Sequence, residues 1–295
     1  MKDGYLVVGG DSLVGGGVLA ALHEKGLPHA STTRRRETVG KKRVFLDFRD
    51  KATFQPPANI GYAFVIAATT NYERCETDPE AHVTNVDHIP RVVVSLLRQG
   101  IFVTFISTNS VFGGERPWPH EDAPHDPRIA YARQKSLGEK AILEGAREIG
   151  TLDRLNIVRL TKILDPTVPP LPGWIDAWKR GEAVEPFGDL IFAPMSVDFV
   201  GRSLVTIGEK KVPGNLHLSG AENVSYTDLA NAMARRLKVS SDLIQPTTAV
   251  AKGIEIAFKP RYSGLGMERT TKLTGIEPQT LDDLVDGLFP APEGS

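Results

Sequence analysis

A tyrosine and a lysine four residues apart, Tyr131 and Lys135, carry side chains that together could move a proton. On a helix such residues share one face, with Cβ atoms about 5–6 Å apart. A free phenol has a pKa near ~10, and a fixed cation beside it favours the phenolate, so that the hydroxyl can give and take a proton. Thr108 follows an apolar run, Ile101 to Ile106, and could hydrogen-bond the same substrate oxygen. An exposed helix face is the alternative interpretation of the pair alone.

The bulk composition describes an ordinary globular protein. Its 295 residues are 41% hydrophobic and 24% charged, which allows a sizeable core. The formal net charge of −1 gives no electrostatic reason to expect nucleic acid or an anionic membrane as partner. Cys75 is the only cysteine, so we expect no internal disulfide and no thiolate zinc site, in a reducing compartment. His120 and His125 have no metal-ligand partners near them in the sequence, so we expect no other metal site. No apolar run approaches ~18 residues and no signal peptide is recognisable, which predicts a cytoplasmic protein.

A glycine turn near the start of the chain is typical of a nucleotide site. The apolar run Tyr5 to Val8 leads directly into it, and apolar residues then recur at helical spacing. Free N–H groups at the start of such a helix can hold a pyrophosphate, although a glycine turn alone is weak evidence. Ser12 stands where a glycine is usual. We predict cofactor contacts at Gly9, Ser12, Leu13, Val14 and Gly15.

An arginine cluster follows the second predicted strand, His29 to Thr33. An acidic residue there would accept a hydrogen bond from the ribose 2′-hydroxyl of NAD, whereas arginine accommodates the 2′-phosphate of NADP. The chain reads Arg34-Arg35-Arg36, so we predict NADP over NAD, with Arg34 and then Arg35 as its ligands. For any one arginine, a solvated basic loop is the alternative.

The next two predicted strands supply the rest of a cofactor site. The first spans 43–47, and Asp47 at its end could face the adenine amino group. The second spans 61–68, and the small residues Ala67, Ala68 and Thr69 would let ribose and nicotinamide approach the backbone. A helix then starts with Asp78 as N-cap. Asn85 on this helix could brace the site or be a plain surface residue.

Strands alternate with helices over residues 1–160, with 155–160 as the sixth strand. This pattern predicts an α/β fold: a Rossmann-type doubly wound parallel sheet. A proline-rich stretch at 165–173 marks a boundary. We expect a cofactor-binding Rossmann domain over 1–163 and a smaller C-terminal α/β substrate lobe over 164–295. Within that lobe, about 196–220 should return to the main sheet.

The order of these motifs resembles the extended short-chain dehydrogenase/reductase superfamily, and within it the dTDP-4-dehydrorhamnose reductase branch. The similarity covers nearly the whole chain. It is carried by Gly9-x-x-Ser12-x-x-Gly15, 105–112 with Glu121-Asp122 and Pro127, Tyr131-x-x-x-Lys135, 138–140, Arg159-Leu-Thr161, 192–194 with Asp198, 217–220 and 268–272. The resemblance implies a Rossmann lobe and a smaller lobe that holds a nucleotide-activated sugar.

Carried over to this chain, the resemblance makes Tyr131 the general acid that protonates a ketone oxygen as hydride arrives from nicotinamide. Lys135 would lower its pKa and hold the nicotinamide ribose, and Thr108 would hydrogen-bond the reacting oxygen. The branch usually has Asp-Tyr after the Ser-Thr pair, where this chain has Asn109-Ser110. That departure argues against a 4,6-dehydratase and leaves the identity of the sugar open.

The leading hypothesis is an NADPH-dependent reductase of a keto group on a nucleotide-activated sugar. The arginine cluster favours it over an NAD-dependent sugar-nucleotide epimerase, because an epimerase regenerates its own NAD. A non-catalytic NADP-binding regulatory subunit is the third hypothesis. A homodimer is left open. The predicted substrate contacts are Thr108, Asn109, Arg159, Thr161 and Met195.

Overall fold

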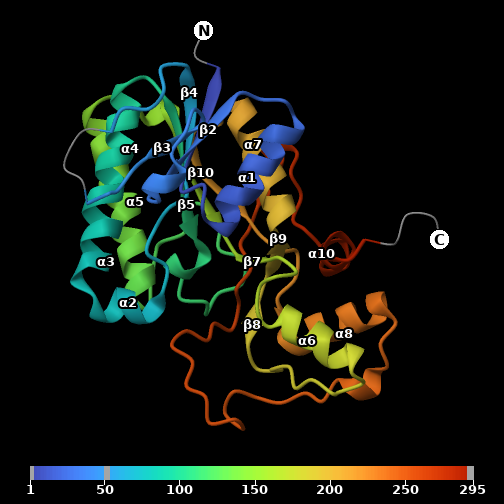
Figure 1. The fold of residues 1–295 in the computed structure, drawn as a ribbon. Coiled ribbons are helices and arrows are strands. Elements are labelled where there is room, and N and C mark those ends of the chain that lie inside the picture. Colours follow the sequence, from blue (N-terminus) through green and yellow to red (C-terminus); the bar gives the residue numbers. More distant parts are fainter. Residues whose placement is uncertain (1–2, 50–53, 291–295) are drawn as a thin grey trace.

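A seven-stranded sheet organises the computed structural model, which describes residues 3–49 and 54–290. Its strands are all parallel and follow the order β10-β6-β5-β4-β1-β2-β3 (Figure 1). This confirms the predicted Rossmann-type fold. The strands are β1 (Gly4–Val8), β2 (His29–Thr33), β3 (Arg43–Phe45), β4 (Ile60–Val65), β5 (Phe102–Thr108), β6 (Leu155–Leu160) and β10 (Gly214–Leu218).

The central strands are almost continuously apolar because helices cover both faces of the sheet. The bounds of β2 and β6 agree with the prediction, whereas β3 and β4 end two and three residues earlier than predicted. In β4 the reason is its partner: Ile66 N and Ala67 N both donate to the carbonyl of Val8, at 2.9 and 3.2 Å, where β1 also ends. Asp47 and the segment 67–69 therefore lie in loops.

Two pairs of helices cover the sheet (Figure 1). On one face lie α1 (Leu13–Glu24) and α7 (Val197–Lys210), and on the other lie α4 (Ile89–Arg98) and α5 (Ala130–Glu148). The pair α1 and α7 packs backbone to backbone, because a Cβ built on Gly201 would lie 2.4 Å from the carbonyl oxygen of Gly17.

The segment between β4 and α4 is broken into short helices rather than one. These are α2 (Tyr72–Thr77), α3 (Pro79–Val83) and the π-helical turn η2 (Thr84–His88). Asp78 caps α3 as predicted, its carboxylate accepting from Glu80 N at 3.0 Å. The π turn buries Asn85, and such turns occur frequently at functional sites.

The C-terminal part has its own apolar core, which contains Trp174, Trp178 and Met233. A capping box between Ser225 and Asp228 begins one of its helices, α8. Strand β10 comes from the C-terminal part of the sequence but pairs with β6 in the main sheet. The remaining elements are α6 (Leu171–Lys179), α8 (Tyr226–Leu237), α9 (Glu268–Thr274), α10 (Leu281–Leu288), β7 (Lys162–Leu164), β8 (Ile191–Phe192), β9 (Pro194–Ser196), β11 (Val224–Ser225), and the single turns η1 (Arg36–Thr38), η3 (Asn109–Val111), η4 (Leu152–Arg154) and η5 (Ser241–Leu243).

None of the helices within residues 3–49 and 54–290 is both long and apolar enough to cross a membrane.

Candidate active site

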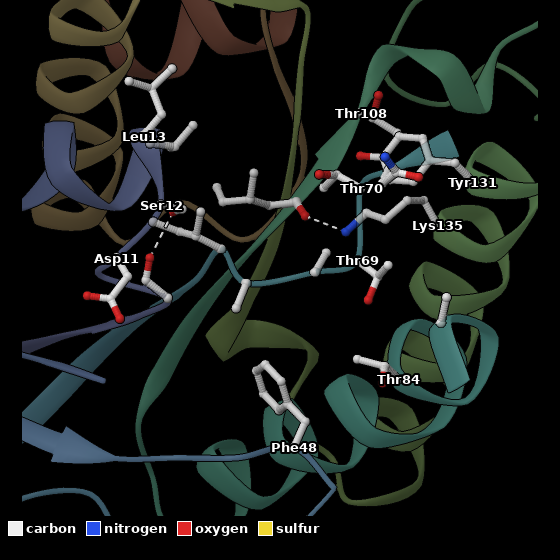
Figure 2. Close-up of a pocket in the computed structure, with 18 of the residues that line it drawn as sticks. Asp11, Ser12, Leu13, Phe48, Thr69, Thr70, Thr84, Thr108, Tyr131 and Lys135 are labelled. Atoms are coloured by element: carbon white, nitrogen blue, oxygen red, sulfur yellow. Dashed lines mark hydrogen bonds between the residues drawn. The ribbon is translucent and has the colours of Figure 1, made fainter. Parts of the chain in front are cut away.

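A cavity of about 720 Å³ lies at the carboxyl ends of the parallel strands (Figure 2). It spans the point where the strand order reverses, between β1 and β4, which is where open α/β sheets bind ligands. Most of the predicted site residues meet there. They are Gly9, Ser12, Leu13, Val14, Arg34, Asp47, Ala67, Ala68, Thr69, Thr108, Tyr131, Lys135 and Thr161.

The glycine turn is held by packing and by Ser12. Gly9 has a positive φ of 97°, and a Cβ there would lie 2.8 Å from Ala67 N. Gly15 sits behind the turn, since a Cβ on it would lie 2.2 Å from the carbonyl oxygen of Gly9. Ser12 is the N-cap of α1: its hydroxyl accepts from Gly15 N at 3.1 Å and donates to the Gly9 carbonyl at 2.8 Å. The serine that departs from the usual motif therefore has a local structural role.

Asn85 braces the loop that follows β4. Its side-chain oxygen accepts from Thr69 N at 3.0 Å, and its amide nitrogen donates to the Thr69 carbonyl at 2.9 Å. The same nitrogen donates to Gln134 Oε1 at 2.9 Å, which ties the loop to α5 next to Lys135. Asn85 is only 1% exposed, so it is a buried brace and not a surface residue.

Tyr131 and Lys135 lie on the first turns of α5 and face the cavity together with Thr108 (Figure 2). Lys135 is 3% exposed; its ammonium donates to the Ile106 carbonyl at 2.7 Å and sits 4.0 Å from the centre of the Phe105 ring. The Thr108 side chain lies near the Tyr131 hydroxyl and opposes the rise of the Tyr131 pKa. One acid–base group and one cation therefore converge on the end of β5.

Burial controls the protonation of both residues. It lowers the pKa of Lys135 to about 7, against the opposing charge of Glu139. Burial also raises the pKa of Tyr131, with neighbouring Tyr72 adding to the effect and the Thr108 side chain opposing it. This differs from the expectation that Lys135 lowers the pKa of Tyr131, because desolvation penalises the charged form of both groups. Tyr131 is consequently a protonated donor at neutral pH.

Asn109, predicted to contact substrate, instead forms hydrogen bonds with the C-terminal part of the chain. Its side-chain nitrogen donates to the Ser263 carbonyl at 2.8 Å and to the Ser263 hydroxyl at 2.9 Å. Thr108 caps η3 by accepting from Ser110 N at 3.2 Å, and the Thr108 and Ser110 hydroxyls are 3.0 Å apart. Asn109 does not line the cavity, and it joins the end of β5 to the C-terminal part of the chain.

Two other predicted substrate contacts do not reach the cavity. Arg159 is 2% exposed, and its guanidinium is bound by Glu139 at 2.8 Å and by the Glu121 carbonyl at 2.9 Å. Met195 is fully buried in the apolar core beside the sheet. We correct these two assignments, because a buried ion pair and core packing leave neither side chain free. The predicted cofactor ligand Arg35 also does not line the cavity. Its guanidinium group pairs with the carboxylate of Asp11.

Polar lining residues that the sequence analysis did not select include Asp11, Thr70, Asn71 and Thr84. Thr70 and Asn71 continue the polar run after β4, and this position at the end of a strand could have identified them as site residues. Asp11 was overlooked because the backbone N–H groups of a glycine turn, and not its side chains, are expected to contact an anion.

The donor set fits a nicotinamide dinucleotide. The start of α1 carries no acidic residue in its first turn, which leaves its N–H groups suitable for a pyrophosphate. Arg34 supplies a cation beyond β2, and Tyr131, Lys135 and Thr108 lie at the opposite side of the same cavity. Because the lining joins both regions in one space, it can accommodate an extended ligand with a phosphate-rich middle.

Comparison with known proteins agrees with this geometry. A family model described as the RmlD substrate binding domain matches residues 3–289. The chain is 30% identical over 217 residues to a probable dTDP-4,6-dihydroxy-2-methyloxan-3-one 4-ketoreductase of Streptomyces antibioticus, covering 72% of this chain and 71% of the relative. It is 27% identical over 223 residues to a dTDP-4-dehydrorhamnose reductase of Streptomyces griseus, covering 72% and 70%.

Among solved structures, the dTDP-4-dehydrorhamnose reductase of Bacillus anthracis in complex with NADP superposes with a TM-score of 0.79. The two chains are 18% identical and 98% of each is covered, a likeness that supports the fold. The family match spans nearly the whole chain and both lobes. The chain therefore belongs to the RmlD substrate binding domain family, within the extended short-chain dehydrogenases/reductases, and is an NAD(P)-dependent oxidoreductase of that type.

Proposed function

We propose that this protein is an NADPH-dependent reductase of a keto group on a nucleotide-activated sugar. The observation that carries the proposal is the meeting of Tyr131, Lys135 and Thr108 in one cavity with the glycine turn. The relatives from Streptomyces antibioticus and Streptomyces griseus are named as reductases of dTDP-linked keto sugars, which supports the substrate class.

The proposed cofactor would be held along the strand ends. Leu13 and Val14 at the start of α1 would contact its pyrophosphate, and Ala67 to Thr69 would leave room for ribose and nicotinamide. Bound there, the cofactor supplies the hydride. The preference for NADPH rests on Arg34, which lines the cavity and forms no ion pair within the described residues.

Asp47 is a weaker candidate for an adenine contact than the sequence suggested. Arg49 binds its carboxylate at 2.5 Å and, with a smaller effect from Arg34, lowers the pKa of Asp47 to about 2. The carboxylate therefore stays ionised as an acceptor, but Arg49 already occupies much of its hydrogen-bonding capacity.

The chain's own groups then handle the proton. Because burial keeps Tyr131 protonated, its hydroxyl can donate to the oxyanion that develops on the substrate ketone. Thr108 sits at the same strand end and can stabilise that oxygen with a hydrogen bond. Lys135 lies one turn further along α5, and a bound anion would raise its pKa and favour the ammonium.

The direct test mixes the purified protein with NADPH and a panel of 4-keto sugar nucleotides and follows absorbance at 340 nm. We expect turnover with at least one substrate and its loss in Tyr131→Phe. Absence of turnover over the whole panel, together with an unaltered biological role for Tyr131→Phe, would exclude the reductase. The epimerase alternative instead predicts NAD that stays bound during purification, and mass spectrometry of released nucleotide tests it.

A further inference from the structure

Asp11 joins the glycine turn to the arginine cluster. It lines the cavity, and its carboxylate oxygen Oδ1 pairs with Arg35 Nη2 at 3.2 Å and with Arg43 Nη2. The other oxygen accepts from the Thr33 hydroxyl at 2.7 Å. Figure 2 shows this carboxylate beside Ser12, across the drawn pocket from Tyr131. One side chain thus gathers two guanidinium groups and the end of β2.

The cations in this corner are not equivalent. Arg34 lines the cavity and has no ion-pair partner within the described residues, whereas Arg35 and Arg43 are already paired with Asp11. The Nε of Arg43 is buried without a hydrogen-bond partner. Together with the pair of Asp47 and Arg49, which also lines the cavity, these groups make four guanidinium groups and two carboxylates, so the corner has a net positive charge. An incoming phosphate would be attracted but would compete with Asp11 for Arg35 and Arg43.

We propose that Asp11 is a specificity-determining residue, a built-in counter-anion for Arg35 and Arg43 that limits the affinity of the cavity for a 2′-phosphorylated dinucleotide. The inference rests on the proposed function, because it takes the cavity as a nicotinamide dinucleotide site. Arg34 then provides the attraction for the phosphate, and Asp11 sets how much the other two arginines add.

Asp11 does not act as a helix cap, and this separates its charge from its structural contacts. Ser12 caps α1, so the helix start remains intact when Asp11 is changed. Asp11→Asn removes the negative charge but keeps a side-chain oxygen that can accept from Thr33. A change of nucleotide preference in this variant would report charge, since the shape of the turn is preserved.

The experiment measures dissociation constants for NADPH and NADH by calorimetry, without sugar substrate. In Asp11→Asn we expect NADPH to bind about three- to tenfold more tightly, and NADH to change less than twofold. The matched control is Glu37→Gln, which removes the same charge from exposed η1 nearby and should change both constants less than twofold. Added salt should weaken NADPH binding more steeply in Asp11→Asn, because more cations face the phosphate.

A double variant tests whether Asp11 acts through its paired arginine. In an Arg35→Gln background, Asp11→Asn should tighten NADPH binding less than it does alone. If Asp11→Asn fails to fold, variants of the two arginines test the same inference. Arg35→Gln should weaken NADPH binding less than twofold, because Asp11 already neutralises Arg35. Arg34→Gln should weaken it at least tenfold. Equal losses in these two variants would overturn the inference.

Two failures are distinguishable. A wild-type protein that binds neither nucleotide contradicts the proposed function. A wild-type protein that binds them, with a folded Asp11→Asn whose NADPH to NADH affinity ratio is unchanged or reduced, contradicts the role of Asp11 alone.

Discussion

The buried cations Lys135 and Arg159 differ in their hydrogen-bond partners and in whether they line the cavity. Lys135 and Arg159 are 3% and 2% exposed. Arg159 is bound by the carboxylate of Glu139, whereas the ammonium of Lys135 contacts a backbone carbonyl and an aromatic ring and forms no ion pair within the described residues. Lys135 lines the cavity and Arg159 does not. A buried cation whose hydrogen bonds are all made within the protein supports the fold. A buried cation that faces a cavity and is not paired with a carboxylate is available to a ligand.

The electrostatics of the two sites follow from this difference. Glu139 accepts from Ser107 and from Arg159, so the buried pair has most of its hydrogen-bonding capacity satisfied. A buried pair of this kind is costly to break, because one charge is left uncompensated. Lys135 forms no ion pair within the described residues, and burial lowers its pKa to about 7 although the charge of Glu139 partly opposes this. The comparison predicts that changes on the cavity side alter activity, and changes at the pair alter stability.

The largest expected effect is on the cavity side, in Tyr131→Phe. The variant keeps the ring but loses the proton donor, so kcat/KM for keto reduction should fall by about 10²–10⁴-fold. The midpoint of thermal unfolding should stay within a few degrees of wild type. Steady-state kinetics and calorimetry check the two halves. A variant that is fully active, or one that is inactive because it is unfolded, would break the distinction between the two sides of α5.

The next largest effect is at the ion pair. Arg159→Met leaves Glu139 buried without a cation and should cost about 3–5 kcal/mol of unfolding free energy. Urea denaturation measures it. The double variant Arg159→Met with Glu139→Gln should recover part of that loss, because the uncompensated charge is gone. If Arg159→Met is as stable as wild type and only the KM for substrate rises, the original assignment of Arg159 as a substrate contact is restored.

How far the sequence predicted this site can be explained residue by residue. The strand, turn and helix around Gly9 were predicted because each signal is local: an apolar run, glycines that allow a tight turn, and apolar residues at helical spacing. That Ser12 caps the helix became visible only in the structure. Tyr131 and Lys135 converge because helical spacing alone places them on one face. Thr108 was found because it ends a strand, and the ends of parallel strands share one edge of the sheet.

The wrong predictions concern the direction and burial of side chains, which depend on contacts with other elements of the fold. All six residues of β6 are buried, so alternation could not show that Arg159 faces Glu139 while Leu160 and Thr161 line the cavity. The π turn that buries Asn85 also has no local signal, since it depends on contacts with Thr69 and Gln134. Packing between elements, and not propensity within them, decides these cases.

A smaller expected effect, the pH dependence of the unfolding free energy, distinguishes Lys135 from Arg159. Lys135→Met removes a charge whose burial is unfavourable, but it also loses the hydrogen bond to the Ile106 carbonyl and leaves that buried carbonyl unpaired. The two effects oppose each other, so the net gain in unfolding free energy at pH 7 should be on the order of 1 kcal/mol. The folded pKa is depressed to about 7 and the unfolded value is near 10.5, so between them the unfolded state binds more protons. Wild-type stability should therefore gain a contribution from Lys135 as pH rises through this window. The advantage of the variant should shrink from pH 7 to pH 10.

Urea titrations of both proteins at pH 7 and pH 9.5 check this, with Lys140→Met as an exposed control on the same helix. The control should show no comparable pH-dependent difference from wild type. A Lys135→Met difference that is constant over the window would show that the proton stays on Lys135, and the contrast with Arg159 would then rest on geometry alone.

The smallest effect tests Asn109, a predicted site residue whose hydrogen bonds, like those of Arg159, are made within the fold. Asn109→Asp removes the N–H group that donates to the Ser263 carbonyl and sets two oxygens against each other. The expected cost is about 1 kcal/mol of unfolding free energy, partly offset if the Ser263 hydroxyl turns to donate to the new carboxylate. Ser263→Ala, which keeps the carbonyl, should cost less. Because Thr108 precedes Asn109 directly, we expect kcat to fall severalfold with little change in KM. An Asn109→Asp variant that is fully stable, with an altered KM only, would place Asn109 with the substrate groups and not with the paired ones.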